Sequence, residues 1–185
     1  MNEEVFAKGK LFELVHTKQP DGRTFEVARR APGVRLIIFN KDSQKLLLTK
    51  EFRKELDDWD YRLPGGKLFD SLDDYEAHRL SDNDIIDAAK AQAVAEARQE
   101  AGIDIAGLEL YKKSVLGATV EWDLYVFEAI DWRKSETGQE LEDGEDIDAD
   151  TWVSIDEAKR MILDGKMQVE RIALILLRWM EDKAS

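Results

Sequence analysis

The segment 63–103 restricts the fold of this chain more than any other part of the sequence. It begins with the residues LPGGK at 63–67, which are typical of a strand that ends in a tight turn. It closes with an alanine-rich stretch that has the composition of a helix and is stopped by Gly102. Glu96 and Glu100 stand four positions apart in this stretch, so we expect their carboxylates on one face of a helix, about one turn apart.

The Glu96–Glu100 pair has two interpretations. Two anionic oxygen donors beside a glycine turn can hold Mg²⁺ against a diphosphate. Most glutamates on helices instead belong to a solvated face. The pair by itself does not decide between a metal site and a solvated surface, so the rest of the chain has to be considered.

The charge balance limits the classes of ligand. The chain has 185 residues, which fits one domain over 1–185. It carries 40 acidic and 27 basic residues, and the net charge of −13 disfavours binding to nucleic acid or to an anionic membrane. The same balance suits a protein that recruits divalent cations to a phosphorylated ligand. No cysteine is present, so the sequence excludes disulfides and zinc–thiolate sites.

Nothing in the sequence indicates a membrane segment or an export signal. The first residues lack the basic and apolar regions of a signal peptide. The longest apolar run near the C-terminus, 172–177, is far too short to span a bilayer. We therefore expect a cytoplasmic protein.

Two hairpins are predicted in the first third of the chain. Strand-like segments at 10–15 and 24–28 flank the turn residues PDG at 20–22, and this predicts an N-terminal β-hairpin within 1–30. The second predicted hairpin has nearly continuous apolar strands, at 34–39 and 45–49. Such strands are typical of a sheet that is covered by helices on both faces.

Two polar segments follow. The charged segment 51–60 is interpreted as a loop, and the acidic segment 67–83 has room for a short helix but does not resemble core. The next predicted elements are a helix at 84–101 and strands at 108–116, 120–130 and 151–153.

The C-terminal part of the chain is predicted to be helical. Ser154 with Glu157 three residues later is a capping box, which predicts a helix N-terminus. A last helix at 169–181 places an apolar stripe on one face. That stripe consists of Ile172, Ile175, Leu176 and Trp179, broadened by Leu174 and Leu177. The order of elements predicts an α+β fold with a mixed β-sheet between helices.

Segment 63–103 resembles the signature of the Nudix hydrolases, G-x5-E-x7-R-E-U-x-E-E-x-G-U, in which U is a bulky apolar residue. The matching residues are Gly66, Glu96, Glu100, Gly102 and Ile103. Four positions depart from the signature: Asp87, counted back from the helix, replaces the first Glu, Ala95 replaces Arg, Ala97 replaces a bulkier residue, and Gln99 replaces Glu. Glu96 also follows Gly66 by 30 positions (96 − 66), where the signature has 15, which indicates a 15-residue insertion within 67–84.

The resemblance extends to ADP-ribose pyrophosphatases and related nucleoside diphosphate sugar hydrolases. Their [Q]-[YF]-R segment is similar to EFR at 51–53, and their G-x-[ST]-x-E segment is similar to GATVE at 117–121. The acidic stretch 142–147 and the segment 152–166 continue the similarity. The resemblance implies a Nudix fold with an N-terminal hairpin, and a homodimer with the strands of 1–30 and the helix-rich end of the chain near its interface.

The resemblance also implies a site with Mg²⁺, or alternatively Mn²⁺, as cofactor. The implied metal ligands are the Gly66 carbonyl, Glu96, Gln99, Glu100 and Glu121. The implied catalytic residues are Glu96, Asp143 and Glu145, and the implied substrate-binding residues are Phe52, Arg53, Gly117 and Thr119. Each acidic-loop residue also has a plain interpretation as a solvated charge, and Phe52 has one as core.

Two functions remain open from the sequence. The first is a Mg²⁺-dependent pyrophosphohydrolase that cleaves ADP-ribose or another nucleoside diphosphate sugar to a nucleoside monophosphate and a sugar phosphate. The second is a Nudix domain that binds a nucleotide ligand without turnover. It is motivated by Gln99, which carries no charge, and by Ala95, which removes an orienting arginine. A plain interaction module would leave the glycine turn and the glutamate pair unexplained.

Overall fold

The computed structural model describes residues 2–54, 57–141 and 147–184. The chain forms two compact units, each assembled from three separate stretches of sequence. The first unit comprises Met1–Arg35, Gly66–Ala93 and Leu110–Val126, and the second comprises Leu36–Gly65, Val94–Glu109 and Phe127–Ser185. Neither unit is a continuous piece of chain, and one domain over 1–185 stays a prediction.

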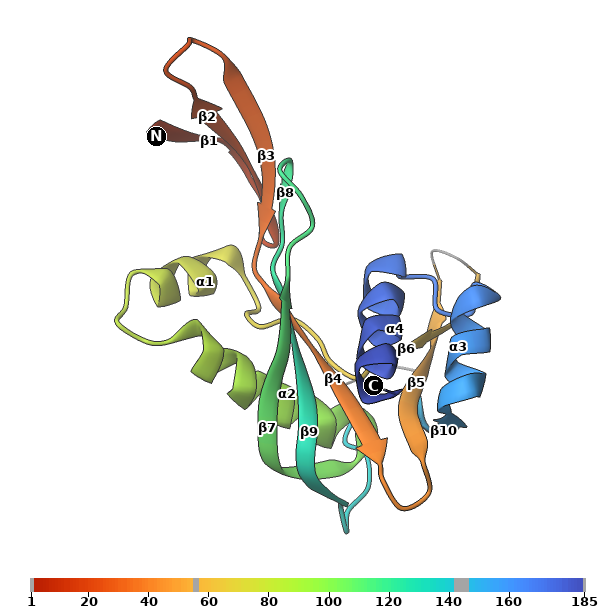
Figure 1. The fold of residues 1–185 in the computed structure, drawn as a ribbon. Coiled ribbons are helices and arrows are strands. Elements are labelled where there is room, and N and C mark those ends of the chain that lie inside the picture. The colour runs from red at the N-terminus through yellow and green to blue at the C-terminus, as the bar shows by residue number, and fades with distance from the viewer. Residues whose placement is uncertain (1, 55–56, 142–146, 185) are drawn as a thin grey trace. The chain divides into compact units, whose positions relative to one another are not determined.

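The first unit contains a four-stranded sheet in the order β1-β2-β3-β8 (Figure 1). Its strands are β1 (Asn2–Lys8), β2 (Phe12–Lys18), β3 (Thr24–Arg30) and β8 (Val120–Glu121). Strands β2 and β3 pair antiparallel across a turn in which Gly22 has a φ of 84°, so the predicted N-terminal hairpin is confirmed. Strand β1 was not predicted, and β8 runs parallel to β3.

The insertion folds as part of the first unit. Helix α1 (Leu72–Arg79) begins after the N-cap residue Ser71. The backbone N–H of Leu72 donates a hydrogen bond to the carbonyl of Lys10 at 2.9 Å. Leu68 and Leu72 are buried. The expectation that this polar segment contributes nothing to a core is therefore wrong, because its two leucines are removed from water.

A six-stranded sheet has the order β10-β5-β4-β9-β7, with β6 paired to β5. Its strands are β4 (Gly33–Asn40), β5 (Lys45–Arg53), β6 (Asp58–Arg62), β7 (Ile103–Ser114), β9 (Leu124–Lys134) and β10 (Ile147–Ser154). The part of this sheet that lies in the second unit contains the predicted apolar strands. Ile37, Ile38 and Leu46–Leu48 are almost completely buried, which confirms that both faces of these strands are covered.

Three further helices are α2 (Ile85–Ala101), α3 (Ile155–Leu163) and α4 (Glu170–Ala184). Helix α3 begins at the predicted cap, where the Ser154 hydroxyl accepts the backbone N–H of Glu157 at 3.2 Å. Helix α4 packs its predicted stripe inward, and the ring of Trp179 lies 5.5 Å from that of Phe39. Leu174 is 50% exposed, so its assignment to the buried stripe was wrong. The α+β class of the fold is confirmed.

The charged segment 51–60 is not a loop throughout, as the sequence suggested. Strand β5 continues to Arg53, and β6 begins at Asp58. The charges are accommodated by pairing within the hairpin: Arg53 lies 2.7 Å from Glu51, and Arg62 lies 2.6 Å from the fully buried Asp60. Side-chain pairing therefore permits a strand where the composition indicated a loop.

In the described residues, no helix is both long and apolar enough to cross a bilayer.

Candidate active site

The glycine turn and the C-terminal turn of α2 are joined directly in the second unit. The backbone N–H of Gly65 donates a hydrogen bond to Glu100 Oε2 at 2.6 Å. Gly65 has a φ of 136°, a conformation that favours glycine. The adjacent carbonyl of Pro64 accepts the N–H of Leu36 on β4 at 2.9 Å. The turn is therefore fixed between the sheet and the helix, as the sequence predicted for a glycine turn beside the paired glutamates.

The side chain of Glu96 is largely removed from water. Its relative exposure is 9%, and the neighbouring Ala97 is completely buried. Gln99 and Glu100 are half-buried. A carboxylate that loses its water needs compensating partners. The interpretation of the pair as a solvated helix face does not describe Glu96.

These residues form a donor set that fits Mg²⁺. Glu96 and Glu100 supply two carboxylates on one helix face, and Gln99 supplies a neutral amide oxygen. Among residues 2–54, 57–141 and 147–184, no group of three or more His, Asp or Glu side chains is arranged to hold a metal ion. Mg²⁺ is commonly bound through one or two carboxylates, with the remaining positions taken by water and substrate phosphates. A two-carboxylate site therefore suits this ion when a diphosphate completes it.

Two of the implied metal ligands lie in the first unit. The carbonyl of Gly66 accepts the backbone N–H of Val34 at 3.0 Å, which uses one of its two lone pairs. Glu121 is in β8, where its Oε2 accepts a hydrogen bond from Arg29 Nε at 2.8 Å. Glu121 is thus held by a guanidinium, and a role as metal ligand stays a proposal.

Arg29 is a charged centre that the sequence did not single out. Its guanidinium also lies 2.9 Å from Glu3 and 3.2 Å from Glu13, and both Arg29 and Glu13 are buried. Burial lowers the pKa of Arg29, but hydrogen bonds and charge from Glu121 and Glu3 outweigh it and hold the pKa above its ordinary value. Arg29 therefore remains a cation that orients Glu121.

The predicted substrate residues Gly117 and Thr119 lie in the exposed segment that precedes β8. Gly117 has a φ of 145°, a conformation in which a residue with a side chain would be strained. The carbonyl of Thr119 accepts the N–H of Ala28 at 2.9 Å, so this segment is attached to β3. Both residues belong to the first unit, together with Glu121.

Phe52 and Arg53 lie at the end of β5 in the second unit. The ring of Phe52 contacts that of Trp59 edge-on, with 5.5 Å between ring centroids. Arg53 Nη1 donates to Glu51 Oε1 at 2.7 Å. Arg53 is thus part of an ion pair, and a phosphate ligand would compete with Glu51 for its guanidinium.

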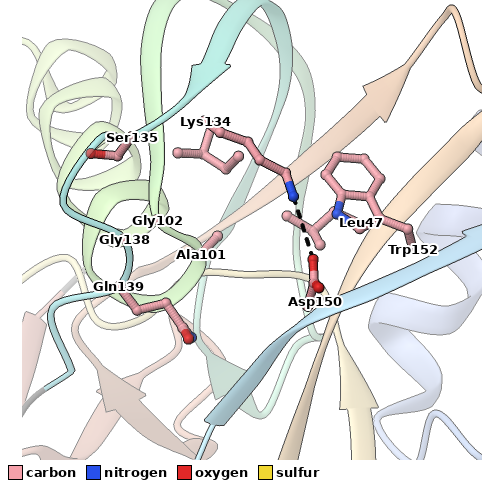
Figure 2. A pocket seen from close by; sticks show the side chains of 10 residues that line it. Leu47, Ala101, Gly102, Lys134, Ser135, Gly138, Gln139, Asp150 and Trp152 are labelled. Carbon is pink, nitrogen blue, oxygen red and sulfur yellow. Dashed lines mark ion pairs between the residues drawn. The ribbon is translucent and has the colours of Figure 1, made fainter.

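Two predicted catalytic residues, Asp143 and Glu145, lie outside the described residues. The chain that precedes them packs against the end of α2, beside a cavity of about 280 Å³ (Figure 2). Figure 2 shows Ala101 and Gly102 on the helix end, with Gly138 and Gln139 from the segment after β9. The cavity is lined by Leu47, Ala101, Gly102, Ile103, Lys134, Ser135, Gly138, Gln139, Asp150 and Trp152.

A family model described as NUDIX domain matches residues 29–173. The chain belongs to the Nudix family. A solved structure described as "Crystal structure of ADP compounds hydrolase" is similar over 99% of this chain and 94% of that one, with a TM-score of 0.67 and 18% sequence identity. This likeness confirms the predicted Nudix fold. No curated protein matches the chain.

The two parts of the Nudix signature are separated in sequence by the insertion, but they are in contact in the structure. The turn before the insertion and the helix after it meet through the Gly65–Glu100 hydrogen bond. The Nudix helix keeps two carboxylates, at Glu96 and Glu100, with the amide of Gln99 in place of a further one. The insertion that separates the two parts forms α1 in the first unit, so it lengthens the chain without breaking the hydrogen bond between turn and helix.

Proposed function

We propose that this Nudix protein is a Mg²⁺-dependent pyrophosphohydrolase, with Mn²⁺ as an alternative ion. Its proposed substrate is ADP-ribose or another nucleoside diphosphate sugar, cleaved to a nucleoside monophosphate and a sugar phosphate. The observation that supports this most is the Gly65–Glu100 hydrogen bond of 2.6 Å, which sets a carboxylate beside the glycine turn with the buried Glu96 one helical turn away. The neighbour's description as an ADP compounds hydrolase agrees with this substrate class.

The proposed chemistry requires charge neutralisation and a positioned water. A divalent ion, when bound, supplies positive charge to the diphosphate oxygens. Glu96 and Glu100 would hold that ion, with Gln99, Glu121 and the Gly66 carbonyl as further ligands. Because Gly65 fixes one oxygen of Glu100, this carboxylate needs little reorganisation when charge develops on the phosphate.

Other residues are proposed to move the proton and to bind the substrate. Glu96, Asp143 or Glu145 would accept the proton of the attacking water. Arg53 would clamp a phosphate or the distal ribose, and Phe52 would contact the base. Gly117 and Thr119 would contribute further substrate contacts.

The proposal predicts hydrolysis that depends on a divalent metal. The protein is incubated with a panel of nucleoside diphosphate sugars in the presence of Mg²⁺, of Mn²⁺, or of a chelator. We expect monophosphate products with either ion and none with the chelator. Without a cation, the two negative carboxylates would repel the diphosphate and could not neutralise its charge. Product formation that persists in excess chelator would contradict the metal dependence.

The alternative function is a Nudix domain that binds its ligand without turnover. It is favoured by Gln99, whose uncharged amide lowers the negative charge available to a cation. The same panel separates the two functions. If no member of the panel yields product and one of them raises the melting temperature, the result would support the binder and contradict the hydrolase.

We also propose that the chain is a homodimer formed through the first sheet. Val5, Phe6 and Phe25 on β1 and β3 are exposed apolar side chains, and such residues are enriched at protein interfaces. Light scattering is expected to give about 42 kDa, twice the 21.2 kDa of one chain. We expect Phe6→Asp to give the monomer mass, because it would bury a charge in the interface. A monomer mass for the unsubstituted protein would exclude this assembly.

A further inference from the structure

The C-terminal end of α2 is capped by the segment that follows β9. A helix leaves its last carbonyls without intrahelical partners. Here the backbone N–H of Glu140 donates to the carbonyl of Gln99 at 3.0 Å, and the side-chain amide of Gln139 donates to the carbonyl of Glu100 at 2.5 Å. The N–H of Ser135 donates to the carbonyl of Gly102 at 2.8 Å. The segment 135–140 therefore completes the end of the helix that carries Glu96 and Glu100.

Arg98 holds this segment against the helix. Its guanidinium donates to Glu140 Oε1 at 2.6 Å and to the carbonyl of Gly138 at 3.3 Å, and it also contacts the hydroxyl of Thr137. Asp104 lies 3.7 Å away as a second acidic partner. One planar cation thus reaches a carbonyl, a hydroxyl and a carboxylate of the same segment through two of its nitrogens, whereas an ammonium has to make all of its contacts from one nitrogen.

The contact between segment and helix leaves no space for a side chain. A Cβ added at Gly102 would lie 2.9 Å from the backbone carbon of Gly138. Gln139 also donates to the carbonyl of Ile147 at 3.2 Å, so it links the helix end to the first residue of β10. Figure 2 shows Gly138 and Gln139 beside Gly102 and Ala101 at this contact.

Glu100 is consequently held at two points. Its carboxylate accepts the N–H of Gly65, and its backbone carbonyl accepts the amide of Gln139. If the segment were released, the last turn of α2 would lose its caps and fray, and Glu100 would no longer be fixed relative to the glycine turn.

We propose that Arg98 is a positioning residue for the Glu96–Glu100 pair, which it orients by clamping the segment 135–140 onto the C-terminal turn of α2. This role rests on the function proposed above, because it concerns the metal site of that function. If Arg98 had a purely structural role, its removal would lower the free energy of unfolding and would leave the metal affinity of the folded protein unchanged. The proposed role differs, because it predicts a change at the metal site.

The test compares Arg98→Ala with the same substitution at a second arginine, Arg133. Arg133 on β9 also pairs with Asp104, at 3.5 Å, and its side chain is 79% exposed. We expect Arg98→Ala to weaken Mn²⁺ binding and lower kcat, each by about tenfold or more, because a residue that orients metal ligands typically contributes that much. KM should change less than kcat. Arg133→Ala should leave both quantities unchanged.

A second measurement follows the segment itself. Hydrogen exchange at the amides of Ser135 and Glu140 should accelerate in Arg98→Ala, because these amides donate to the helix end. Arg98→Lys keeps the charge but not the planar guanidinium. It should show smaller changes in amide exchange and in Mn²⁺ affinity than Arg98→Ala. Glu140→Gln should shift Mn²⁺ affinity in the same direction, since it weakens the same contact from the side of the segment.

The outcomes separate this role from the function on which it rests. Unchanged Mn²⁺ affinity in Arg98→Ala, together with faster amide exchange, would show that the segment is released without consequence and would overturn the positioning role alone. Absence of Mn²⁺ binding in the unsubstituted protein would overturn the proposed function and this role with it. A folded Arg98→Ala protein with weaker Mn²⁺ binding and a normal Arg133→Ala protein would support the role.

Discussion

Replacing Glu96 or Glu100 by Gln is expected to reduce metal-dependent hydrolysis by about 100-fold or more, because each is a proposed metal ligand and the loss of such a carboxylate removes several kcal/mol of charge stabilisation. Glutamine preserves the size of the side chain, and its amide oxygen can still accept the N–H of Gly65 when it replaces Glu100. The change therefore tests the charge of each carboxylate rather than its packing. Initial rates at saturating Mg²⁺, with the best substrate of the panel, give the comparison.

The control for these variants is Glu109→Gln. Glu109 is exposed on β7 in the second unit, and Glu109→Gln changes the net charge of the protein by the same amount as the other two substitutions. We expect its rates to match those of the unsubstituted protein. Full activity in both Glu96→Gln and Glu100→Gln would show that the active site has been assigned to the wrong residues, even if the protein is a hydrolase.

Gly102→Ala is expected to lower the free energy of unfolding by about 2–4 kcal/mol, combining backbone strain with a steric clash. Gly102 has a φ of 60°, which costs a residue with a side chain about 1–2 kcal/mol. Its new Cβ would also lie 2.9 Å from the backbone of Gly138, which has no flexible side chain to move aside. Urea denaturation followed by circular dichroism measures the change.

Gly165→Ala separates the two contributions. Gly165 has a φ of 71°, and a Cβ there would meet nothing within 4 Å. Its substitution should cost only the backbone strain, about 1–2 kcal/mol. Equal losses in Gly102→Ala and Gly165→Ala would mean that the close approach between the helix end and Gly138 does not contribute to stability.

The elements that the sequence predicted correctly are those whose pattern arises within a single segment. The apolar runs of β4 and β5 indicated burial on both faces, and Ser154 marked the start of α3. The missed strand β6 has the sequence DWDYR, whose charges indicate a loop when they are considered alone. In the structure, Asp60 is fully buried because it pairs with Arg62 and accepts the N–H of Gln168 at 2.8 Å. The contact with Gln168 joins residues 108 positions apart in sequence, so it leaves no local signal in the segment of β6.

The candidate site shows the same difference between patterns within one segment and contacts between distant segments. Glu96 and Glu100 could be predicted because their spacing places them on one helix face, and the glycine turn suggested what lies beside them. The guanidinium beside Glu121 could not be predicted, because Arg29 reaches it only after β3 and β8 pair. Arg98 suggested no function by its spacing, because its partners come from the segment 135–140.

Mn²⁺ binding, measured by calorimetry or by electron paramagnetic resonance, tests most directly whether the Nudix helix of this chain holds a metal ion. The measurement needs no substrate, so it does not depend on which sugar or base the protein accepts. We expect saturable binding to the unsubstituted protein and to Glu109→Gln, and binding at least tenfold weaker in Glu100→Gln, because the proposal makes this carboxylate a metal ligand. Equal affinity in Glu100→Gln and the unsubstituted protein would contradict the assignment of the metal site.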